Sequence, residues 1–121
     1  MYHSVRKDAI TTEKLRDGLQ ETVLRLKDLD GYPDGAVASR MIAGKKTGSV
    51  TLFSFDEDEG LSDHTAPYDA VVTILDGGCE VRAGGQTFPM KEGETIIIPA
   101  NKPHALSATK QSRMMLVMIG E

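Results

Sequence analysis

From Gly31 onward, the chain alternates short apolar segments with turns that are rich in glycine, asparagine and aspartate. Gly-Gly, Asp-Gly and Glu-Gly pairs recur at roughly ten-residue spacing, which is typical of β-hairpins and meanders. The segments between them are filled mainly with β-branched and other apolar residues, which favour strands. No second helical pattern intervenes, so the spacing predicts an all-β domain, either an antiparallel sandwich or a barrel.

The first residues of the chain have a different character. They are polar and charged, so we expect an N-terminal arm over residues 1–20, partly helical, before a barrel over residues 21–121. Thr11 or Thr12 can cap a helix, and four apolar residues follow at helical spacing: Leu15, Leu19, Val23 and Leu26. Gly18 weakens this helix, which is therefore expected to be short, and residues 23–26 are an alternative first strand.

Composition excludes several classes of function. The 121 residues carry a formal net charge of −4, whereas a nucleic-acid-binding protein needs a basic face. No apolar run approaches the roughly 20 residues that span a bilayer, and the N-terminus lacks the apolar stretch of a signal peptide. Cys79 is the single cysteine, so no internal disulfide forms. We therefore expect a cytoplasmic protein that binds neither nucleic acid nor membrane.

Two histidines are the candidate functional residues. His64 and His104 each lie next to a predicted strand, close to a proline. Neutral imidazole at the mouth of a barrel is a good ligand for zinc, iron, copper or nickel. Buried histidines that only form structural hydrogen bonds are the alternative, and the separation of the two residues in the sequence leaves both interpretations open.

The segment GETIIIPANKPH, at residues 93–104, resembles the second motif of the cupin superfamily of small jelly-roll barrels. Gly93, Pro99 and His104 match that motif at its spacing. Asn101 stands at the position of its second glycine and, like glycine, tolerates positive φ. Ala108 replaces the final asparagine. The resemblance extends over roughly residues 35–119 and implies a single antiparallel jelly-roll β-barrel.

The segment HTAPYDAVVTILDG, at residues 64–77, resembles the first cupin motif with two of its ligands replaced. His64 and Gly77 match the motif, while Ala66 stands for its second histidine and Ala70 for its glutamate. The resemblance thus implies an incomplete metal site that retains only His64 and His104. A catalytic zinc usually has three protein ligands, so we expect zinc, nickel or iron to be absent or weakly held. The even-numbered residues His64, Ala66 and Ala70 are expected to face inward. Strand alternation places the nearby Asp63 and Asp69 out of phase with them.

The two alanines remove side-chain volume from the barrel interior, so the sequence predicts a ligand pocket around the two histidines. Its expected lining is His64, His104, Tyr68, Ala66, Ala70, Phe53 and Met118. Two functions follow. One is a module that binds a small organic ligand between His64 and His104. The alternative is a metal-dependent enzyme, an oxygenase or an isomerase, that uses the two histidines with water ligands. No sequence feature identifies a substrate.

We also expect a homodimer. Proteins that this chain resembles pair sheet to sheet, and the apolar residues of the arm, Leu15, Leu19 and Val23, need a surface to cover. Symmetric pairing is the commonest way to supply one.

Overall fold

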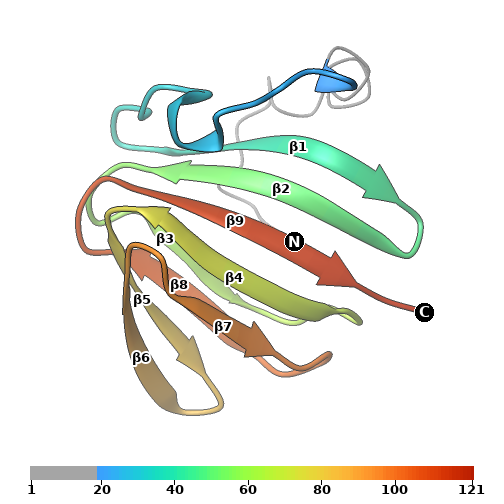
Figure 1. Cartoon of the computed structure of the whole chain (residues 1–121). Helices are drawn as coiled ribbons and strands as arrows, with labels where there is room; N and C mark the ends of the chain where they lie inside the picture. The colour runs from blue at the N-terminus through green and yellow to red at the C-terminus, as the bar shows by residue number, and fades with distance from the viewer. Residues whose placement is uncertain (1–18) are drawn as a thin grey trace.

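The computed structural model describes residues 19–121, and strands make up nearly all of their regular structure (Figure 1). The strands of this part of the chain are β1 Val37–Lys45, β2 Gly48–Phe55, β3 Gly60–His64, β4 Asp69–Asp76, β5 Gly78–Ala83, β6 Gln86–Lys91, β7 Thr95–Ile98, β8 His104–Ala108 and β9 Ser112–Ile119. The prediction of a single antiparallel jelly-roll domain is confirmed.

The strands form two sheets. One has five strands in the order β1-β2-β9-β4-β7, and the other has four in the order β3-β8-β5-β6. Every recorded strand pair is antiparallel. The last strand, β9, lies in the middle of the five-stranded sheet, between β2 and β4. Pro89 lies in β6, an edge strand, where its missing N–H breaks no interior ladder.

The core lies between the two sheets and contains alternate residues of the strands. In β4 the residues Ala70, Val72 and Ile74 are all buried, as the predicted strand phase requires. The Phe53 and Phe55 rings of β2 stack with their centroids 6.0 Å apart. Most of the stabilisation of the fold therefore comes from apolar surface removed from water between the sheets.

Two turn residues have positive φ that the sequence explains. Gly77 has φ +86°, and a Cβ atom there would lie 2.2 Å from the carbonyl oxygen of Gln111. Only glycine fits that turn. Asn101, which takes the place of a motif glycine, has φ 67°. This is the left-handed conformation that asparagine was expected to tolerate there.

Residues 19–28 test the predictions for the junction between the N-terminal arm and the barrel. Leu19 is helical, but Glu21 has φ 54°, and the chain has no regular structure from residue 22 to residue 25. The left-handed backbone at Glu21 ends the helix, because a right-handed helix cannot continue through it. The alternative strand at residues 23–26 is wrong, since Leu26 begins the 3₁₀ helix η2, Leu26–Asp28. The expected helical residues before Leu19, with the cap at Thr11 or Thr12, lie outside the described residues.

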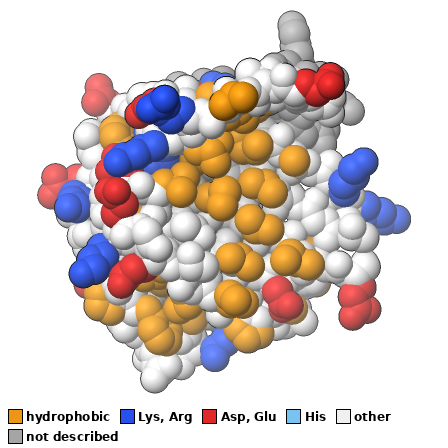
Figure 2. Space-filling view, in the orientation of Figure 1, with side chains coloured by type: hydrophobic (Ala, Val, Ile, Leu, Met, Phe, Trp, Pro, Cys, Tyr) orange, Lys and Arg blue, Asp and Glu red, His pale blue; other side chains and the backbone are white. Residues whose placement is uncertain are grey.

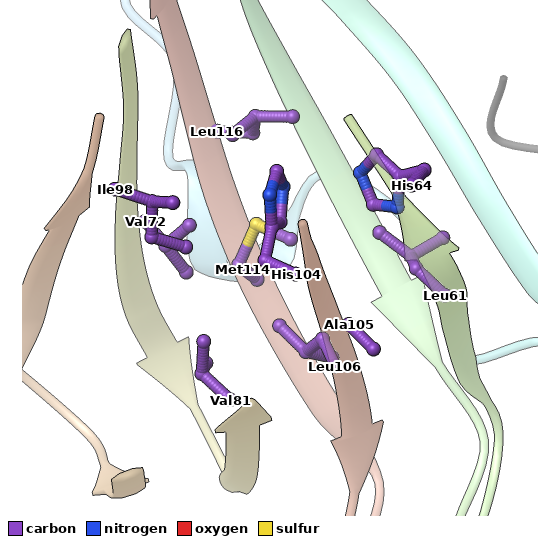
Figure 3. Close-up of a pocket in the computed structure, with 10 residues that line it drawn as sticks. All are labelled: Leu61, His64, Val72, Val81, Ile98, His104, Ala105, Leu106, Met114 and Leu116. Atoms are coloured by element: carbon purple, nitrogen blue, oxygen red, sulfur yellow. The ribbon is translucent and has the colours of Figure 1, made fainter. Parts of the chain in front are cut away.

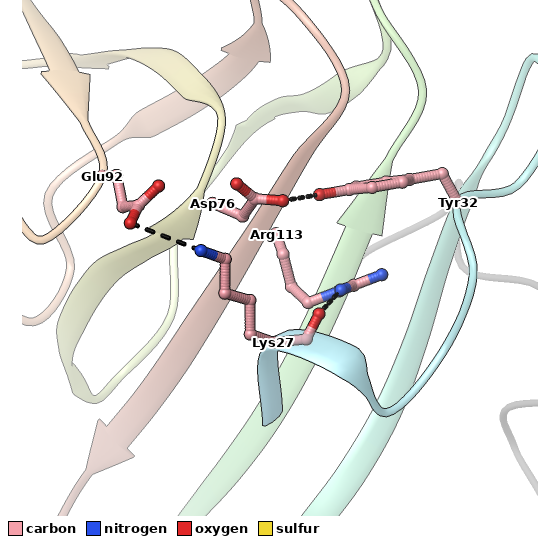
Figure 4. Close-up of polar contacts among 5 residues, drawn as sticks. All are labelled: Lys27, Tyr32, Asp76, Glu92 and Arg113. Carbon is pink, nitrogen blue, oxygen red and sulfur yellow. Dashed lines mark hydrogen bonds and ion pairs between the residues drawn. The ribbon is translucent and has the colours of Figure 1, made fainter. Parts of the chain in front are cut away.

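Arg113 of β9 attaches the segment that follows η2 to the five-stranded sheet (Figure 4). Its side chain is buried, and Nε donates to the Ser54 hydroxyl at 3.2 Å. The two terminal nitrogens donate to the carbonyl oxygens of Lys27 and Asp30. The guanidinium carbon lies 4.5 Å from the centroid of the Tyr32 ring, a cation–π distance. One arginine thus binds the segment at three places.

Tyr32 and Lys27 add contacts to the ends of neighbouring strands. The Tyr32 hydroxyl donates to the Asp76 carboxylate, and the Lys27 ammonium lies 3.5 Å from the Glu92 carboxylate (Figure 4). Burial, followed by the hydrogen bond and the charge of Asp76, raises the pKa of Tyr32 to about 12. The tyrosine therefore remains a hydrogen-bond donor throughout the physiological pH range.

Residues 19–121 include no helix with the length and apolar character needed to cross a membrane.

Candidate functional site

A small cavity lies inside the barrel, next to His64 and His104 (Figure 3). Both sheets contribute to its walls, which are otherwise apolar. The largest wall side chains include Val72, Ile98, Leu106, Met114 and Leu116. Among the described residues that line this cavity, the two imidazoles are the only ionisable groups.

The two histidines lie on paired strands. His64 ends β3, His104 begins β8, and the two residues are register partners across that strand pair. Their ring centroids lie 4.2 Å apart, with an angle of 60° between the ring planes. A sequence separation of 40 residues thus becomes direct contact, because the chain returns antiparallel to the same sheet edge.

Each imidazole is oriented by a backbone carbonyl two residues before it. Nδ1 of His64 lies 2.6 Å from the Ser62 oxygen, and Nδ1 of His104 lies 2.9 Å from the Lys102 oxygen. A carbonyl oxygen can only accept, so Nδ1 carries the proton in both rings. In the neutral rings Nε2 is then the nitrogen with the lone pair, which is the tautomer of a metal-binding or hydrogen-bond-accepting histidine.

Burial lowers the pKa of His64 below its ordinary value, and the nearby His104 lowers it further. The hydrogen bond to Ser62 and the charge of Asp63 oppose this shift but do not cancel it. His64 is therefore neutral at pH 7, which preserves the lone pair on its Nε2.

Acid should destabilise the protein through this histidine. The unfolded chain binds a proton near pH 6.5, whereas folded His64 binds it only at lower pH. Its contribution to stability is therefore complete above about pH 6.5 and is lost as pH falls through the folded pKa. Urea unfolding measured between pH 7.5 and pH 5 should show this loss. The variant His64→Asn should have a smaller dependence of the free energy of unfolding on pH. An unchanged slope in the variant would contradict the prediction.

The structure distributes the other predicted site residues differently. Phe53 and Ala70 are buried in the main core cluster, and Met118 packs against that cluster. Ala66 is buried after β3, where its carbonyl accepts a hydrogen bond from the Asn101 amide at 2.8 Å. None of these four residues lines the cavity at the histidines.

Tyr68 also lies away from the histidine cavity. Its side chain is half-buried, its hydroxyl donates to the Lys46 carbonyl at 3.2 Å, and its ring lies against Gly120. Tyr68 has the parity of the inward-facing residues, but residues 65–68 lie between β3 and β4, so strand phase does not apply there.

The cavity is smaller than the two alanine substitutions led us to expect. The volume open to the centre of a water molecule is about 10 Å³, which is enough for about one water. Neighbouring core side chains, Met114 among them, therefore occupy most of the space that a larger ligand would need. The inward phase of their strands marks these residues in the sequence.

The metal that the fold family implies requires more donors than this site supplies. Among residues 19–121, no group of three or more histidine, cysteine, aspartate or glutamate side chains could hold a metal ion. Ala66 and Ala70 have no donor atoms, and the Asp69 carboxylate instead accepts a hydrogen bond from the Ala100 amide at 2.9 Å. Two imidazoles do not fit a tightly held catalytic metal, which usually has three protein ligands.

Comparisons with known proteins agree with this architecture. Residues 51–120 match the family model described as cupin domain. The chain is similar to the crystal structure of a conserved protein of unknown function from Streptococcus pyogenes, with 33% identity and a TM-score of 0.80, covering 84% of this chain and 90% of that one. A cupin 2 conserved barrel domain protein from Leptotrichia buccalis shows 35% identity and a TM-score of 0.76, covering 79% of this chain and 47% of that one.

A cupin superfamily protein from Desulfitobacterium hafniense has the same fold, with 24% identity and a TM-score of 0.79, covering 84% of this chain and 94% of that one. No curated protein matches the chain.

Proposed function

The chain belongs to the cupin family, and from that premise we propose that it binds a small organic ligand at His64 and His104 without a tightly held metal. The observation that carries the proposal is the shared orientation of the two imidazoles. Each ring is held by its own backbone carbonyl, so both present Nε2 as an acceptor beside an apolar cavity. A few polar groups in an otherwise apolar recess are typical of small-molecule sites.

The chemistry of the site defines the ligand class. With Nδ1 of each ring directed at a backbone carbonyl, hydrogen bonds to a ligand are accepted at Nε2, so the ligand carries a hydroxyl or another donor on a small apolar body. A group the size of water fits without rearrangement. A larger body needs the lining to yield, and Met114 is the wall side chain most able to adapt.

Phenol and toluene form a matched pair of probes, because they differ only by a hydroxyl in place of a methyl group. Phenol should shift the Nε2 resonances of His64 and His104 in long-range ¹H–¹⁵N spectra and raise the melting temperature, since it binds only the folded state. Toluene should do neither to the same extent.

Equal binding of the two probes would show that only the apolar cavity matters. The absence of any shift with phenol would contradict the proposal. Zinc titration of the wild-type protein distinguishes the alternative metal-dependent enzyme, because tight stoichiometric binding would favour that alternative.

A further inference from the structure

A second recess, here called the outer recess, lies on the outer face of the four-stranded sheet. Its lining includes Asp63, Arg82, Gly84, Thr87 and Pro103. About 430 Å³ of it is open to the centre of a water molecule, against about 10 Å³ at the histidines. That volume accommodates a small organic molecule without any movement of the walls.

Charge distinguishes the outer recess from the opposite side of the molecule. The face drawn in Figure 2 is largely apolar at its centre and has most of its charged side chains near the edge. The outer recess is lined by a carboxylate, Asp63, and a guanidinium, Arg82, and both side chains are exposed.

Strand register turns Arg82 to the outside of the barrel. Arg82 follows Val81, which is buried between the sheets, so alternation directs the arginine outward. Its register partners are Thr87 on β6 and Ala105 on β8. Directly paired residues share a face, so the hydroxyl-bearing Thr87 stands next to Arg82.

A β-bulge turns Asp63 to the same face. The register of β3 and β8 shifts between Leu61 and His64. Two residues of β3, Ser62 and Asp63, therefore oppose a single residue of β8, Ala105. Both are exposed, whereas the residues on either side of them line the inner cavity. The carboxylate thus faces outward from one neighbour of β8, and the guanidinium faces outward from the other.

The two opposite charges do not bind each other. The three ion pairs recorded among residues 19–121 include neither Asp63 nor Arg82. Two strand spacings separate their backbones, about 10 Å, and side chains of a strand stand roughly perpendicular to the sheet. By contrast, the charged groups of the comparably large recess beside Arg113 already have partners.

We propose that the outer recess binds a small zwitterion, with the carboxylate of the ligand at Arg82 and its ammonium group at Asp63. A guanidinium offers a carboxylate two parallel N–H donors, and the Asp63 carboxylate accepts from the ammonium group. Two hydrogen bonds of about 2.9 Å each leave about 4 Å of the separation for the ligand. Two carbon atoms between the ammonium nitrogen and the carboxyl group span this distance, as in β-alanine.

Lys102 adds a second cation at the carboxylate end of the outer recess. Its side chain is exposed and lies over Gly84, where a Cβ atom would be 2.5 Å from the Lys102 Cε. Asp63 repels a simple anion, and the two cations repel a simple cation. Only a molecule that carries both charges uses all three groups, which makes the outer recess selective.

Amide chemical shifts in ¹H–¹⁵N spectra of the full chain test this site with β-alanine as the probe. Propionate and propylamine are the matched controls, because each keeps the three-carbon chain and only one of the two charges. β-Alanine at millimolar concentration should shift the amides of Asp63, Arg82 and Thr87. Each control should bind at least about 10-fold more weakly, because it lacks one charge-assisted contact.

Two variants test the two contacts separately. Asp63→Asn and Arg82→Gln should each weaken β-alanine binding by at least about 10-fold. Both residues are exposed, so circular dichroism should show folded variants. Glu80→Gln is the control, because Glu80 is exposed on the same strand as Arg82 but does not line the outer recess, and it should bind like the wild-type protein.

Three results would overturn the proposal. Propionate that binds as tightly as β-alanine would reduce the outer recess to a simple anion site. Unchanged binding in Asp63→Asn or in Arg82→Gln would place the probe elsewhere. The absence of any shift with β-alanine would show that the two charges do not act together on a ligand.

Discussion

Replacing Arg113 with alanine should lower the free energy of unfolding by about 3 kcal/mol, because the change removes a buried side chain and leaves two partly buried backbone carbonyls without their donor. The arginine is 3% exposed and binds Ser54 together with the carbonyl oxygens of Lys27 and Asp30. Denaturant unfolding measures the loss. Hydrogen exchange should show a second effect, with the amides of residues 26–32 losing protection while those of the barrel strands retain theirs.

Arg25→Ala is the matched control. Its guanidinium lies 3.8 Å from Asp28, but both side chains are largely exposed, at 84% and 66%. Such an exposed ion pair contributes little to stability. The free energy of unfolding of this variant should therefore remain within about 0.5 kcal/mol of that of the wild-type protein. A loss of less than about 1 kcal/mol for Arg113→Ala would contradict the attachment role.

The double change Ala66→His and Ala70→Glu should give the largest change in metal affinity. With His64 and His104 it would complete the set of three histidines and one glutamate that the cupin resemblance implies. Zinc should bind the variant on the order of a thousand-fold more tightly than the wild-type protein, because third and fourth ligands are added. Titration calorimetry with zinc and with nickel measures the difference.

Packing opposes this change and makes the test sharper. Both alanines are buried, at 4% and 2% exposure, and the cavity holds about one water. Without metal, the variant should therefore be destabilised by about 1–3 kcal/mol, and zinc should reverse the loss. The control variant Ala66→His with Ala70→Gln has nearly the same bulk without the charge. It should therefore recover less stability when zinc is added. A well-folded variant that binds no zinc would show that the geometry for metal is lost.

Much of the architecture could be predicted because it depends on local signals. The glycine-containing turns mark where strands end, and alternation correctly predicts that Ala70 faces inward. Gly77 and Asn101 occupy turns with positive φ, as their residue types suggest. These features follow from two or three neighbouring residues, so a single sequence contains them.

The parts that could not be predicted depend on residues far apart in the chain. The size of the cavity depends on how side chains from both sheets fill the space, which no local pattern encodes. Tyr68 follows Pro67 in a loop, so its direction is set by contact with Lys46 and Gly120. Arg113 stands at the start of a mostly apolar strand, a visible signal, but its two backbone carbonyl partners precede it by more than 80 residues.

The central position of β9 also orders the folding of the chain. Strands β2 and β4 do not pair with each other. Each of them pairs with β9, which is the last strand of the described residues. During synthesis the hairpin of β1 and β2 can form early, as can the pair of β4 and β7, but they cannot join until residues 112–119 leave the ribosome. Two unsatisfied sheet edges therefore persist until β9 has left the ribosome. Loss of β9 would not shorten the barrel; it would divide the larger sheet into two separate pairs.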